Sequence, residues 1–157
     1  MQHYKSFDPE TEMVGQTVLS LVNSIMHNDI VDILKKHGLD KIDPLGWYPV
    51  QSVLDVMSDI SKGDNASPVF VSIGMAAAQL GYESMGEDAR QLPIGDFLTL
   101  YSKHYQSRTR YGDAGWIEVE MENERHYVIT SRLPFPDDVF YGTFYAYARL
   151  FRPANKG

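Results

Sequence analysis

The chain contains no cysteine among its 157 residues. This absence excludes disulfides, thiolate metal ligands and cysteine nucleophiles together. Positive charge is also scarce, since 14 lysines and arginines face 21 aspartates and glutamates, for a net charge of −7. Such a balance opposes binding to phosphate backbones, and the one basic group, Lys103, Arg108 and Arg110, is small enough to be a solvated helix end. We therefore expect no nucleic-acid partner.

Long hydrophobic runs are missing as well. The longest largely apolar stretch, residues 69–80 (VFVSIGMAAAQL), is too short to cross a bilayer. The opening residues MQHYKSFDPETEM lack the apolar core of a signal peptide. The sequence therefore predicts no membrane span and a cytoplasmic location.

The common catalytic motifs are absent. There is no Gly-x-Ser-x-Gly elbow, no phosphate-binding loop and no Gly-x-Gly-x-x-Gly fingerprint. His27, His37 and His126 share no metal-ligand spacing, which gives no basis for a metal site. Nothing assembles a nucleophile, a base and an orienting group, so the sequence predicts no catalytic residue and leaves enzymatic activity undecided.

Periodic apolar residues predict several helices. Spacings of three and four indicate helices over about 14–27 and 50–60, and a short helix before Gly38, which suits the left-handed position after a helix end. An almost wholly apolar helix over 69–80 is expected at the centre, with Ser67 as its N-cap and Pro68 at its first position. A further helix is expected to begin at Pro93 and to end before Gly112.

The period changes to two at residue 116. Residues 116–121 and 126–131 alternate around the turn ENER, which predicts an antiparallel hairpin. The order of helices, hairpin and final helix indicates an α+β fold: a helical layer packed on a small antiparallel sheet, with a C-terminal aromatic helix. We expect one domain over residues 14–153 after a loose N-terminal arm of residues 1–13. Because two strands alone are marginally stable, a third strand or a second chain is expected to complete the sheet.

Aromatic residues are concentrated near the C-terminus, with seven in residues 132–153. On a helix, Phe140, Phe144, Tyr147 and Phe151 share one face, and Tyr141, Tyr145 and Ala148 form the adjacent face. Two interpretations stay open. The helix is buried in the core, as aromatic stripes usually are, or it forms the wall of an apolar pocket with tyrosine hydroxyls as its polar points.

A second helical face supplies further candidates. The lone His104 on this face is either a satisfied, partly buried histidine or an axial ligand of haem. Together the two helices and the turn before the last one predict a pocket wall. Its predicted residues are Tyr101, His104, Tyr105, Arg108, Phe135, Tyr141, Phe144 and Tyr145.

Three segments in this order resemble a known family: GWYPVQSVLDVMSDI, SPVFVSIGMAAAQ, and the stretch from HYQSRTRYG through RLPFPDDVFYG to ARLFRP. Over about residues 15–153 the chain resembles small bacterial domains related to the four-vinyl reductase domain, whose fold is similar to TRAPP tethering subunits and haem-nitric-oxide-binding domains. The resemblance implies a frequent dimer and an apolar cavity for haem, an acyl chain or another small molecule. Relatives often carry a cysteine where Asp137 stands here, so no cysteine-dependent role carries over.

These observations give one leading hypothesis and two alternatives. The leading hypothesis is a sensory or regulatory domain that binds a small apolar ligand. The alternatives are a homodimeric scaffold or protein-interaction module, with the aromatic residues at its interface, and a haem-binding sensor that uses His104.

Overall fold

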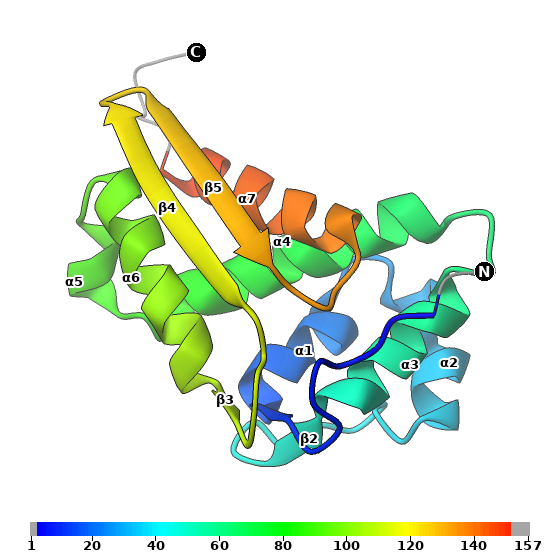
Figure 1. The fold of residues 1–157 in the computed structure, drawn as a ribbon. Coiled ribbons are helices and arrows are strands. Elements are labelled where there is room, and N and C mark those ends of the chain that lie inside the picture. The colour runs from blue at the N-terminus through cyan, green and yellow to red at the C-terminus, as the bar shows by residue number, and fades with distance from the viewer. Residues whose placement is uncertain (1–2, 152–157) are drawn as a thin grey trace.

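A computed structural model describes residues 3–151 and confirms the predicted α+β class (Figure 1). Its helices are α1 (Gly15–Asn23), α2 (Val31–Lys36), α3 (Val50–Ile60), α4 (Ala66–Ser84), α5 (Glu87–Arg90), α6 (Ile94–Ser107) and α7 (Asp137–Leu150), with a short 3-10 helix η1 (His27–Asp29). Its strands are β1 (Glu12–Val14), β2 (Trp47–Pro49), β3 (Thr109–Arg110), β4 (Trp116–Asn123) and β5 (His126–Arg132). Within this range, no helix is both long and apolar enough to span a membrane.

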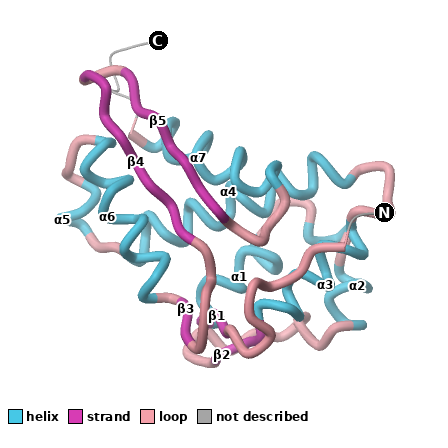
Figure 2. The backbone as a smooth tube through the Cα atoms, viewed as in Figure 1, coloured by secondary structure: helices cyan, strands magenta, loops and turns pink. Residues whose placement is uncertain are grey.

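The strands form two separate antiparallel sheets (Figure 2). β1 lies between β2 and β3, and its Met13 is paired with both Tyr48 and Thr109. The predicted hairpin is confirmed as β4–β5, which remains two-stranded within the described chain, so the expected third strand does not join it. The helical layer supports it instead, because Val119 and Ile129 pack into an apolar cluster with α6 and α7.

The helices α4 and α7 make the most extensive contact in the fold. Gly74 of α4 lies against the backbone of Val139, and Gly142 of α7 lies against the backbone of Val71. The small side chains let the two helices approach closely. The central position predicted for α4 is borne out, since Val69 and Ile73 are fully buried.

The start of α4 differs from the prediction. The helix begins at Ala66, so Ser67 and Pro68 lie inside its first turn, and Asn65 precedes it without a side-chain cap bond. Proline is tolerated there because the first-turn N–H groups have no partner within the helix. Ser67 is therefore not the cap.

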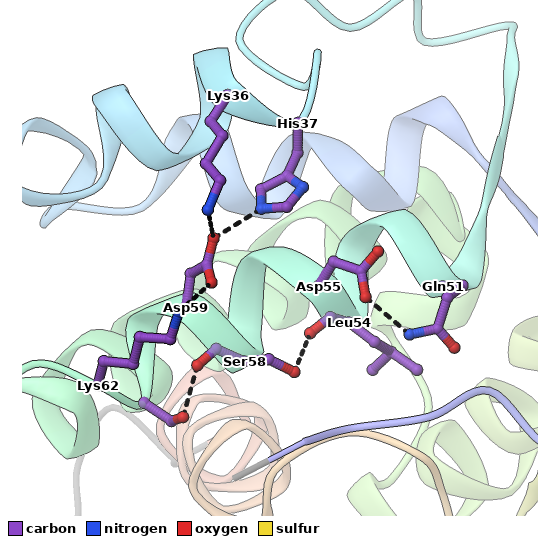
Figure 3. Close-up of polar contacts among 9 residues, drawn as sticks. Lys36, His37, Gln51, Leu54, Asp55, Ser58, Asp59 and Lys62 are labelled. Atoms are coloured by element: carbon purple, nitrogen blue, oxygen red, sulfur yellow. Dashed lines mark hydrogen bonds and ion pairs between the residues drawn. The ribbon is translucent and has the colours of Figure 1, made fainter. Parts of the chain in front are cut away.

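A charged cluster joins α2 to α3 (Figure 3). The Asp59 carboxylate lies 2.8 Å from His37 Nε2, 2.9 Å from Lys36 Nζ and 3.1 Å from Lys62 Nζ. The hydrogen bonds from His37, then Lys36 and Lys62, hold the pKa of Asp59 well below its ordinary value. Gly38 follows α2 with φ 72°, in the left-handed conformation that the sequence predicts.

The N-terminal arm is not loose where the structure describes it. The Tyr4 N–H donates to Ser58 Oγ at 3.0 Å, and the Ser6 N–H donates to Gln51 Oε1 at 2.9 Å. Gln51 Nε2 in turn donates to the Tyr4 carbonyl at 3.1 Å. These bonds fix Tyr4 and Ser6 to α3, and we call residues 4–11 the N-terminal strap. Residues 1–2 lie outside the described range, as do residues 152–153 at the other predicted boundary.

The core divides into two apolar clusters. One surrounds Leu21, Leu54 and Ile73 of α1, α3 and α4. The other surrounds Phe97 and Tyr147 of α6 and α7. The candidate site lies between them.

Candidate functional site

A cavity of about 350 Å³ separates the two core clusters. Its wall comes from helices α1, α3, α4, α6 and α7, from both strands of the hairpin and from the N-terminal strap. Most lining side chains are apolar, among them Val18, Val53, Ile73, Ile117, Phe140 and Phe144. The site is therefore a partly open, largely apolar space assembled from segments far apart in the sequence.

Helix α7 distributes its rings over three environments. Tyr147 is fully buried in the core. Phe140 and Phe144 line the cavity, with ring centroids 4.6 Å apart. Tyr141 and Tyr145 are 58% and 43% exposed and stack on each other outside. One face of the helix is therefore core and Phe140 and Phe144 form a cavity wall, while the tyrosines of α7 do not line this cavity.

The hydroxyl-bearing rings on the cavity wall are Tyr101 and Tyr105 of α6. Burial raises the pKa of Tyr101 to about 12, and it raises the pKa of Tyr105 well above its usual range. The Tyr105 hydroxyl donates to the Ala114 carbonyl at 2.6 Å. Both side chains are partly accessible, and both line the larger cavity.

Tyr147 lies directly behind Tyr101, with ring centroids 4.9 Å apart. Its hydroxyl is buried and has no hydrogen-bond partner within the described chain. Burial raises the pKa of Tyr147, and the nearby Tyr101 hydroxyl adds to the effect without meeting the geometry of a hydrogen bond. A buried hydroxyl without a hydrogen-bond partner lowers the stability of the fold.

A smaller cavity of about 50 Å³ adjoins the larger one. Tyr101 and Tyr105 line both, as do Met13, Thr17 and Ala77. His104 and Arg108 line only the smaller cavity, so the structure places them beside the main site rather than on its wall.

The His104 ring is held in a defined state. Arg108 Nε donates to His104 Nε2 at 3.1 Å, and Ser84 Oγ lies 3.2 Å from the same nitrogen. Because a guanidinium only donates, Nε2 accepts and carries no proton. Burial, followed by the positive charge of Arg108, lowers the pKa of His104 in agreement with a neutral ring.

This geometry does not fit haem with His104 as its axial ligand. The Nε2 atom already accepts from Arg108, and the space beside it is the smaller cavity of about 50 Å³. Haem needs a wide apolar pocket directly at the ligating nitrogen. Within residues 3–151 there is also no group of three histidine, aspartate or glutamate side chains that could hold a metal ion.

At the mouth of the larger cavity, where the lining residue Arg132 is exposed, the N-terminal strap contributes Phe7 to the wall. The Arg132 guanidinium lies 3.6 Å from the centroid of the Phe7 ring, and it pairs with Asp113 at 2.7 Å. The Asp113 N–H donates to Asp8 Oδ2 at 2.6 Å, which ties the strap to the loop before β4. Asp137, the exposed first residue of α7, also lines the cavity and forms no ion pair with the described residues, so acidic groups outnumber the single cation at this rim.

Of the predicted wall residues, Tyr101, Tyr105, Phe135 and Phe144 line the larger cavity. Tyr141 and Tyr145 line neither cavity, and their predicted placement on the wall is wrong. The contact of Gly142 with α4 turns their face outward. Sequence reasoning missed Phe7, in a segment expected to be loose, and Ile117, whose alternation marked an inward face without indicating what it covers.

Comparisons of this chain with family models, with curated proteins and with solved structures find no match.

Proposed function

We propose that this protein binds a small, largely apolar molecule in the larger cavity and acts as a sensory or regulatory domain. The observation that carries the proposal is the cavity of about 350 Å³ with its apolar lining. Protein interiors are close-packed, with few voids larger than a water molecule, whereas ligand pockets span roughly 300–1,000 Å³. A bound molecule restores the dispersion contacts that the open space forgoes.

Two further features agree with ligand binding. The lining offers rings, aliphatic side chains and hydroxyls, which supply burial and orientation. A helical layer with a small antiparallel sheet is what the resemblance to four-vinyl reductase-related domains implies, and membership of that group remains part of the proposal.

A cavity-filling variant tests the proposal. Ala77 lies on the wall, and Ala77→Leu adds bulk to the space that a ligand would occupy. We expect 1-decanol and naphthalene to raise the melting temperature of the wild type but not of Ala77→Leu. The matched control is Ala148→Leu on the exposed side of α7, which should respond like the wild type. If neither compound stabilises the wild type and a broad panel of apolar molecules gives only the apo mass in native mass spectrometry, the proposal fails.

The exposed tyrosine pair favours a second candidate, in which the same protein docks against a second copy of itself. Tyr141 and Tyr145 stack at 5.9 Å with an interplanar angle of 17°, and Arg149 lies 5.8 Å from the Tyr145 ring. Tyrosine and arginine are enriched at protein interfaces. Light scattering over a concentration series should show a dimer that Tyr141→Ser with Tyr145→Ser dissociates; a wild-type monomer at tens of micromolar excludes this candidate.

A further inference from the structure

Two arginines line the cavities, and they differ in whether a carboxylate of the described residues pairs with them. Arg132 at the mouth of the larger cavity is neutralised by Asp113 at 2.7 Å. Arg108 in the smaller cavity has no carboxylate within ion-pair distance in residues 3–151. The side chain is half-buried, and its one hydrogen bond within this range goes from Nε to the neutral His104.

A half-buried cation without a counter-charge is unfavourable, because it has lost hydration without gaining a partner. The two terminal nitrogens of the Arg108 guanidinium form no hydrogen bond with described residues. They present the planar fork that suits a carboxylate or a phosphate. His104 positions this fork by accepting from Nε, which leaves the terminal nitrogens available.

The smaller cavity gives the fork a space to act in. Its volume of about 50 Å³ is several times the ~10–15 Å³ that a cavity needs to hold one water molecule, so it admits a group of carboxylate size. Five residues line both this cavity and the larger one, so the two spaces share a wall: Met13, Thr17, Ala77, Tyr101 and Tyr105. A molecule passing between the two spaces would meet apolar side chains on one side and an uncompensated positive charge on the other.

We infer that the ligand is an amphiphile whose anionic end pairs with Arg108 in the smaller cavity while its apolar body fills the larger one. This inference rests on the proposed function and specifies the ligand class and its direction. A ligand in the reverse orientation would bring its anionic end to Arg132, whose charge Asp113 already neutralises. The anion would also lie beside the carboxylate of Asp137, which forms no ion pair with the described residues.

The test compares three ligands that share one alkyl chain: decanoate, decyl phosphate and 1-decanol. Their dissociation constants are measured by calorimetry at pH 7.5. Charge-assisted hydrogen bonds predict that at least one anion binds the wild type about 10- to 100-fold more tightly than the alcohol. The two anionic arms distinguish a carboxylate from a phosphate head.

Variants of the two arginines decide which cation is responsible. Arg108→Gln should abolish the preference for the anion while 1-decanol still binds, which also shows that the variant is folded. Arg108→Lys keeps the charge and should retain part of the preference. Arg132→Gln should change the affinities for acid and alcohol together and leave their ratio.

The outcomes separate the inference from the function on which it rests. If 1-decanol binds as tightly as both anions, or if the preference survives Arg108→Gln or disappears in Arg132→Gln, the assignment of the anionic end to Arg108 is overturned and apolar binding stands. If none of the three ligands binds the wild type, the proposed function and the inference fail together.

Discussion

Gly74 of α4 lies so close to α7 that a β-carbon at this position would overlap the carbonyl oxygen of Val139. Gly142 makes the reciprocal contact with the Val71 carbonyl. These two contacts fix the spacing and rotation of α7 against α4. Because Phe140 and Phe144 project from α7, the same contacts decide which rings face the cavity.

Gly74→Ala should therefore destabilise the fold. Overpacking against a neighbouring backbone costs typically about 1–3 kcal/mol, since a carbonyl cannot move aside like a flexible side chain. Gly63→Ala is the control, because its β-carbon would lie 3.4 Å from Asn65 Oδ1, an ordinary contact. Urea denaturation should show a clear loss for Gly74→Ala and a change within about 0.5 kcal/mol for the control. Equal effects in the two variants would contradict the close approach.

The buried hydroxyls of Tyr147 and Tyr105 are expected to respond oppositely to removal. The Tyr147 hydroxyl has no hydrogen-bond partner in the described chain, so Tyr147→Phe removes an unsatisfied group and should leave stability unchanged or raise it by about 1 kcal/mol. Tyr105→Phe loses the 2.6 Å bond to the Ala114 carbonyl and should lower stability by roughly 1 kcal/mol. Thermal and urea unfolding of both variants check the sign of each change. A destabilised Tyr147→Phe would mean that its hydroxyl has a partner.

The acid sensitivity of the fold should depend on Asp59. Its folded pKa lies below the ordinary value of 3.8, so its contribution to stability is complete above that value and is lost as the pH falls below about 4. Asp59→Asn should flatten the dependence of the unfolding free energy on pH between about pH 5 and 2. Asp55→Asn is the matched control on the same helix, where the carboxylate accepts a hydrogen bond from Gln51 and forms no ion pair within residues 3–151 (Figure 3). If the unfolding free energies of the wild type and Asp59→Asn decrease equally as the pH falls over this range, the role of the cluster is refuted.

The attachment of the N-terminal strap should depend on Gln51. Gln51→Ala removes its bonds to Ser6 and Tyr4, and we expect faster hydrogen exchange at the Ser6 amide, whose N–H loses its acceptor. Asp55→Ala removes only the bond from Gln51 to Asp55 and should leave the exchange rate of Ser6 near that of the wild type. Unchanged protection of Ser6 in Gln51→Ala would show that other contacts hold the strap.

Local patterns explain why much of the fold could be predicted. The alternation of Ile117, Val119 and Met121 specifies a strand because side chains on a strand point to opposite faces in turn. The four-residue spacing of Tyr101 and Tyr105 places both rings on one side of α6 for an equally local reason, and the structure puts both on the cavity wall. Such features depend on the backbone geometry of neighbouring residues alone.

Other parts of the site depended on contacts that no local pattern encodes. The sequence offers two adjacent aromatic faces on α7, and nothing near Tyr141 or Tyr145 indicates which one turns inward. Likewise, the strap has the polar composition of a loose arm, and its order comes from partners such as Gln51 and Asp113, which lie 45 residues from Ser6 and 105 residues from Asp8, respectively.

By itself, the sequence determined the class of the fold, the helices and the hairpin, because hydrophobic period and turn chemistry act over a few residues. It also placed a concentration of aromatic residues near the C-terminus. The tertiary structure alone decided that the rings divide between core, cavity and surface, that Phe7 of the strap lines the cavity, and that Arg108 has no counter-charge among residues 3–151. These outcomes arise from the close approach of α4 and α7 and from the spatial distribution of carboxylates, which are set only when distant segments pack together.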